Sequence, residues 1–70
     1  MPLQKRSFSL ARHRTSVALE EAFWAVLEDT ARDAGLSLAA LVARIDAARG
    51  ASPLASALRL AALESARNRR

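Results

Sequence analysis

The segment RHRTSVALEEAFWAVLED, residues 12–29, changes its hydrophobic period partway along. Up to Leu19 apolar and polar side chains alternate, which is the period of a strand with Thr15, Val17 and Leu19 on one face. From Glu20 onward the apolar residues recur every three or four positions, which is the period of a helix. The change predicts a strand over about residues 14–19 that is followed at once by a helix over about residues 20–34.

Two more helices are predicted downstream. Ser37 is suited to cap the second helix, over about residues 37–49, because its side-chain oxygen can accept from an unpaired backbone N–H. Ser52-Pro53 is a typical helix start, with a cap residue followed by proline at the first helical position. The third helix is therefore expected over about residues 52–66.

The ends of the chain carry weaker signals. Residues 1–6 are expected to form a flexible basic arm, and residues 67–70 a frayed tail. Residues 7–11 alternate only weakly and are either a short strand or part of the arm. The predicted domain, residues 7–50, is extended by the C-terminal helix, and no internal repeat is apparent.

A lone strand leaves unpaired N–H and C=O groups along both edges and is not stable in water. The simplest partner is the same strand of a second copy, which predicts an intertwined homodimer with an intermolecular two-stranded antiparallel ribbon. The fold class is then mainly α, with one short strand per chain. The expected dimer core is Val17, Leu19, Phe23, Leu27, Leu38, Val42 and Ile45. Trp24 is expected to pack in the core or in the dimer interface.

The composition limits the classes of function that this chain can have. A chain of 70 residues buries a small core, and without cysteine it has no disulfides, so association with a second copy is the remaining source of stability. The single histidine and the lack of cysteine exclude the common metal sites, and no cofactor is expected. No nucleophile is paired with a base, so an enzyme is not expected. No apolar run reaches the roughly 18 residues of a membrane span, and a cytoplasmic protein with no membrane partner is expected. Peripheral binding to anionic membranes through basic and apolar helix faces is a weaker third possibility.

Positive charge is concentrated at the two ends. Residues 1–14 contain four basic residues and no acid, the middle of the chain is mildly acidic, and residues 51–70 are basic again. Such charge attracts polyanions, and a two-stranded ribbon fits the major groove of double-stranded DNA. The outward side chains of the predicted strand, Arg14, Ser16 and Ala18, suit contacts to guanine, to several base edges and to a thymine methyl group. Lys5, Arg6 and Arg12 are expected at phosphates.

Three segments carry a resemblance: HRTSVALEEAFW (13–24), GLSLAALVARIDAARG (35–50) and LASALRL (54–60). Together they resemble the ribbon-helix-helix superfamily, which includes the Arc and methionine repressors, and within it a group of small bacterial ribbon-helix-helix domains. The resemblance covers about residues 6–64.

The resemblance implies an intertwined dimer that binds DNA through its ribbon, usually as a transcriptional repressor. It implies base contacts at Arg14, Ser16 and Ala18. It also implies a phosphate contact at Ser37 and the N–H of Leu38, which agrees with the affinity of helix N-termini for anions. The chain departs from the pattern at Ala18, where a longer polar residue is frequent, and at Ala11-Arg12, where the narrower group often has glycine.

A second function remains open. The third helix has a broad surface of leucine and alanine, which suits a protein partner bound through residues 54–66. In this reading the chain is an antitoxin-like or adaptor module, and the two functions can coexist. Further association of dimers along DNA is left undecided.

Overall fold

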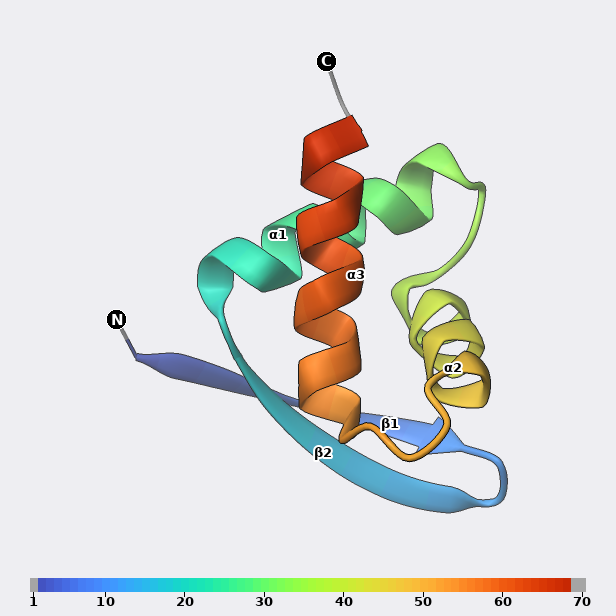
Figure 1. Ribbon diagram of the computed structural model, residues 1–70. Coiled ribbons are helices and arrows are strands. Elements are labelled where there is room, and N and C mark those ends of the chain that lie inside the picture. The colour runs from blue at the N-terminus through green and yellow to red at the C-terminus, as the bar shows by residue number, and fades with distance from the viewer. Residues whose placement is uncertain (1, 69–70) are drawn as a thin grey trace.

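The computed structural model describes residues 2–68 and consists of a β-hairpin followed by three helices. The helices pack over one face of the hairpin, and α3 points away from the strands (Figure 1). The elements are β1 (Leu3–Leu10), β2 (His13–Glu20), α1 (Glu21–Asp33), α2 (Leu38–Ala48) and α3 (Leu54–Asn68). The expected ribbon followed by helices, with an extra C-terminal helix, is confirmed.

The partner of β2 lies in the same chain. β1 pairs with β2 in antiparallel fashion, with Ser7 opposite Ser16 and Leu10 opposite His13. The expectation of one strand per chain is therefore wrong, because residues 3–10 form a second strand that completes the ribbon within one protomer. Residues 3–6 belong to this strand and not to a flexible arm. Of the expected frayed tail, residues 67 and 68 lie in α3 and the rest lies outside the described residues.

The hairpin turn explains why β1 is difficult to predict. Ala11 and Arg12 both have positive φ, 45° and 76°, in the turn between the strands. Two-residue hairpin turns with this conformation strongly favour asparagine and glycine, since a side chain in the left-handed region costs about 1–2 kcal/mol per residue. Ala11-Arg12 lacks that signal, and the pairing of the two strands maintains the turn despite the cost.

The alternation of β2 is confirmed. Val17 and Leu19 are buried under the helices, whereas Arg14 and Ser16 are exposed on the opposite face. Ala18 shares the outward side with them and is half-buried. β1 has the same alternation over its second half, with its apolar residues facing the helices.

The ends of the first two helices are formed by local hydrogen bonds. After α1 the N–H of Leu36 donates to Ala31 O (2.8 Å) and that of Gly35 to Arg32 O (3.0 Å), with Gly35 at a φ of 71°. This is the left-handed cap for which glycine is favoured. At α2, Ser37 Oγ accepts from the N–H of Ala40 at 3.0 Å, which confirms the predicted cap.

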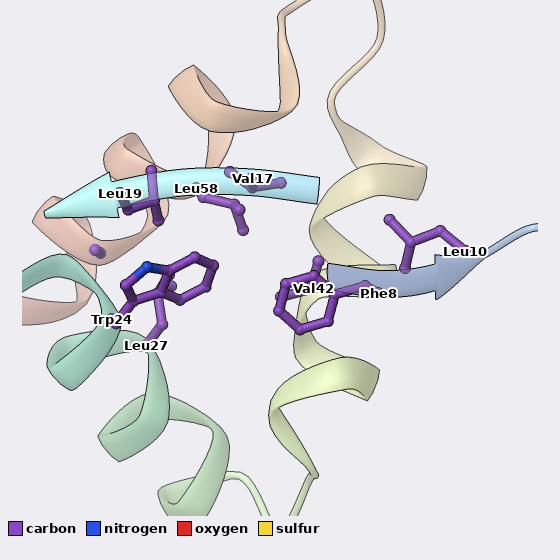
Figure 2. Packing of buried hydrophobic residues seen from close by; sticks show 9 residues of the cluster. Phe8, Leu10, Val17, Leu19, Trp24, Leu27, Val42 and Leu58 are labelled. Carbon is purple, nitrogen blue, oxygen red and sulfur yellow. The ribbon is translucent and has the colours of Figure 1, made fainter. Parts of the chain in front are cut away.

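A single apolar cluster lies between the ribbon and the helices (Figure 2). The buried members are Phe8, Leu10, Val17, Leu19, Trp24, Leu27, Val42, Leu58 and Ala62. The residues expected in a dimer core all belong to this cluster or pack against it, with Phe23, Leu38 and Ile45 only partly buried. They therefore form the core of one protomer.

Trp24 is the largest of the fully buried side chains. Its indole N–H donates to Gln4 O at 2.8 Å, and its ring lies 5.8 Å from that of Phe8. Trp24 thus joins α1 to β1, and the buried face of α1 is centred on Trp24, Leu27 and Ala31.

Candidate nucleic-acid interface

Six side chains form the outward face of the hairpin, which we call the ribbon face. They occupy three cross-strand rows, since Lys5 lies opposite Ala18, Ser7 opposite Ser16 and Ser9 opposite Arg14. The hydroxyl oxygens of Ser7 and Ser16 lie 2.8 Å apart and share a hydrogen bond at the centre of this face. The ribbon face is Lys5, Ser7, Ser9, Arg14, Ser16 and Ala18.

The ribbon face brings together the three residues expected at bases and one of those expected at phosphates. Arg14, Ser16 and Ala18 lie along β2, and Lys5 lies next to Ala18 on β1. Sequence reasoning missed Ser7 and Ser9, because it left residues 7–11 undecided between strand and arm. Their alternation with buried Phe8 and Leu10 is the signal that could have found them.

Arg12, also expected at a phosphate, lies in the hairpin turn and is exposed. It therefore extends the positive charge beyond the end of the ribbon face. Figure 1 shows the turn projecting at one end of the hairpin.

Charge is distributed unequally between the ribbon face and the helical side. Lys5, Arg12 and Arg14 form no ion pair with any residue in 2–68. In contrast, four other arginines are ion-paired: Arg6 with Glu28 (2.7 Å), Arg32 with Asp29 (3.0 Å), Arg49 with Asp46 (2.7 Å) and Arg59 with Glu20 (3.2 Å). Arg44 of α2 and Arg67 of α3 also have no ion pair within residues 2–68, but the ribbon face and turn differ from the helical side in holding no acidic residue beside their three cations.

Arg6 does not belong to this surface. It lies on the helical side of β1, where its guanidinium pairs with Glu28 and sits 5.0 Å from the centroid of the Trp24 ring. Because Arg6 is in phase with buried Phe8 and Leu10, it points away from Lys5. The geometry therefore does not support the expected phosphate contact at Arg6.

Ser37 and Leu38 also lie apart from the ribbon face. They begin α2, which belongs to the helical layer that covers the opposite face of the hairpin (Figure 1). The Leu38 side chain packs partly buried against the core. The structure therefore does not bring the second expected phosphate contact to the surface that carries Arg14.

The only acid in the two strands is turned towards the helices. Glu20, at the end of β2, pairs with Arg59 of α3, and the Arg59 guanidinium also lies 5.9 Å from the Phe23 ring centroid. A hydrogen bond from its own backbone and the Arg59 guanidinium hold the pKa of the Glu20 carboxyl below its usual value. The carboxylate thus joins α3 to the start of α1.

A shallow apolar groove of about 480 Å³ lies between α2 and α3. Its apolar lining includes the side chains of Leu60 and Leu63, which are 61% and 51% exposed. Polar residues at the groove include Glu64 and Arg67, neither of which forms an ion pair within the described part of the chain. This groove, which we call the α3 groove, is separate from the ribbon face.

Other kinds of site find little support among the described residues. No cluster of three or more histidine, cysteine, aspartate or glutamate side chains within residues 2–68 could hold a metal ion. Within the same residues, no helix is both long and apolar enough to cross a membrane.

The fold and the surface define a class of protein: a small domain that presents a two-stranded basic ribbon backed by helices. A model of the ribbon-helix-helix domain family matches residues 3–66, and the chain belongs to this family of DNA-binding domains. Domains of this family are typically non-enzymatic and bind DNA. No curated protein and no solved structure matches the chain.

Proposed function

We propose that the protein is a transcriptional repressor that inserts its ribbon face into the major groove of DNA. The observation that carries the proposal is the charge of the ribbon face and turn, which hold Lys5, Arg12 and Arg14, no acidic residue and no ion pair within residues 2–68. A two-stranded ribbon fits the major groove, and occupation of an operator by such a ribbon excludes other proteins from it.

Each side chain of β2 has a distinct role in this proposal. Arg14 donates two hydrogen bonds to O6 and N7 of guanine, Ser16 bonds to a neighbouring base edge, and the Ala18 methyl group contacts a thymine methyl. Arg12 at the turn contacts phosphate and adds to the salt dependence of binding. The small size of the serines and of Ala18 lets the backbone of the ribbon approach the floor of the groove.

The proposal is tested by titrating the protein into a random-sequence duplex pool and into duplexes selected from that pool, at several salt concentrations. We expect the affinity to fall as salt rises, with log K linear in log salt and a slope of about −0.9 for each phosphate neutralised. We also expect the selected duplexes to bind at least about 10³-fold more tightly than the pool. Absence of binding at low salt, or a flat salt response, would overturn the proposal.

We further propose that two copies associate through their α3 grooves. The grooves expose Leu60 and Leu63 beside a carboxylate and a guanidinium that have no ion pair within residues 2–68, so a second copy can cover the leucines and pair Glu64 with Arg67 across a two-fold axis. An axis parallel to α3 places both ribbons at the same end of the dimer, because α3 rises from the ribbon (Figure 1). The ribbon faces of both protomers then face one duplex.

The dimer is tested by sedimentation velocity of the wild type and of Leu63→Glu. We expect the wild type to sediment as a dimer and Leu63→Glu as a folded monomer, since the variant places a charge in the contact. Ala66→Glu is the matched control, because Ala66 is exposed on the same helix but does not line the α3 groove. A monomeric wild type would overturn the self-association and leave the groove to a different protein, as the adaptor alternative requires.

A further inference from the structure

The two strands of the hairpin repeat each other along the sequence. Residues 5–10 read KRSFSL and residues 14–19 read RTSVAL, so each residue corresponds to the one nine positions later. Basic Lys5 matches basic Arg14, and Ser7 matches Ser16. The correspondence is short enough to escape notice until the strands are paired.

Because of the strand register, the two repeated segments are related by a rotation. Ser7 pairs with Ser16, and their hydroxyl oxygens, 2.8 Å apart, mark the centre of the ribbon face. A half-turn about an axis through this pair, perpendicular to the sheet, exchanges the two antiparallel strands. It carries Lys5 onto Arg14, and Ser9 onto Ala18.

Residues that this rotation relates are buried to similar extents. Phe8 and Val17 are both buried beneath the ribbon, as are Leu10 and Leu19. Arg6 and Thr15, which also correspond, are both half-buried. The two halves of the hairpin are thus equivalent on the core side as well as on the ribbon face.

From this symmetry we infer that the hairpin of one protomer forms a complete DNA-binding surface with two equivalent halves. This surface recognises a quasi-palindromic stretch of duplex DNA. The inference rests on the proposed function and assigns base contacts to Lys5 and Ser9 as the counterparts of Arg14 and Ala18. Lysine and arginine both donate to guanine O6 and N7, but the arginine fork makes the more discriminating contact. The two halves therefore read the same base with unequal strength.

Four proteins test the equivalence: the wild type, Lys5→Arg, Arg14→Lys and the exchanged double variant Lys5→Arg/Arg14→Lys. Lys5 and Arg14 are exposed and unpaired within the described chain, so all four proteins should fold alike, as circular dichroism will verify. Each is measured against a duplex selected by the wild type and against random duplex. Arg44→Lys, an exposed cation on α2, is the control for a conservative change away from the ribbon face.

We expect Arg14→Lys to lose about five- to tenfold in affinity for the selected duplex, as expected when a bidentate arginine contact is replaced by lysine. In duplexes that each protein selects from a random pool, the exchanged variant should place the stronger guanine preference in the opposite half of the site, because the arginine fork has moved to position 5. Lys5→Arg alone should bind most tightly and select a more perfect palindrome.

An exchanged variant whose selected duplexes keep the stronger guanine preference in the same half of the site, or show none, would overturn the equivalence of the two halves. So would a Lys5→Arg variant that selects guanine no more strongly than the wild type in the half read by residue 5, because a basic side chain at a phosphate carries no base preference. Failure of all four proteins to bind DNA would instead overturn the proposed function, so the two outcomes are distinguishable.

Discussion

Trp24→Ala is expected to cost about 3–5 kcal/mol of folding free energy, the usual range for removing a buried tryptophan. The side chain is fully buried, and its loss removes the contact with the Phe8 ring and the hydrogen bond to Gln4 O, both on β1. Domains have roughly 0.05–0.15 kcal/mol of stability per residue, so a chain of this length has little to spare. The variant should be largely unfolded at 37 °C.

The measurement is urea and thermal denaturation followed by far-ultraviolet circular dichroism, because Trp24 is the only tryptophan and its fluorescence is lost with it. Leu3→Ala is the control, an exposed residue outside the α3 groove whose truncation should change stability by less than about 0.5 kcal/mol. Trp24→Phe separates the two contributions, since it keeps most of the apolar volume but leaves Gln4 O without the indole N–H. A loss below about 1 kcal/mol for Trp24→Ala would contradict the role of this side chain in joining β1 to α1.

Arg14→Ala is expected to weaken binding to a selected duplex by about 1–3 kcal/mol, or roughly 5- to 150-fold. The reason is the proposed bidentate contact with guanine, whose loss should also relax the preference at one base pair. Because the side chain is exposed and has no ion pair among the described residues, the variant should keep the stability of the wild type.

Fluorescence anisotropy with selected duplexes, each altered at one base pair, measures both the affinity and the preference. Arg44→Ala removes the same charge from α2 and should weaken binding to every duplex slightly and equally. Arg12→Ala should reduce the salt slope by about 1 without changing the base preference, as expected for a phosphate contact. Equal losses for Arg14→Ala and Arg44→Ala would show that Arg14 contributes general charge and not a base contact.

Local periodicity predicted much of this fold. The alternation over residues 14–19 placed Val17 and Leu19 in the core and Arg14 on the outside, as the structure has them. Ser37 was predicted as a helix cap, because capping depends on a side chain and the backbone of the following turn. Such signals depend on neighbouring residues, so they can be recognised in a single sequence.

The errors concern contacts between distant segments. Arg6 and Lys5 are adjacent in sequence and equally basic, yet one pairs with Glu28 and the other is unpaired within residues 2–68. Lys5 and Arg6 are assigned to opposite faces only once β1 is recognised as a strand. The turn that would indicate this strand is hard to predict, because Ala11-Arg12 lacks the residues that hairpin turns favour. Likewise Phe23 and Trp24 are neighbours in sequence, but the helix orientation against β1 buries Trp24 completely and leaves Phe23 at the edge beside Arg59.

The sequence by itself determined the strand and helix periods, the three helices and the basic character of the N-terminal region, because these depend on neighbouring residues. The tertiary structure alone decided that β1 completes the ribbon within one protomer and which basic side chains stay unpaired. The physical reason is that pairing partners and ion pairs are set by segments far apart in the chain, whose positions are fixed only when the common core is packed.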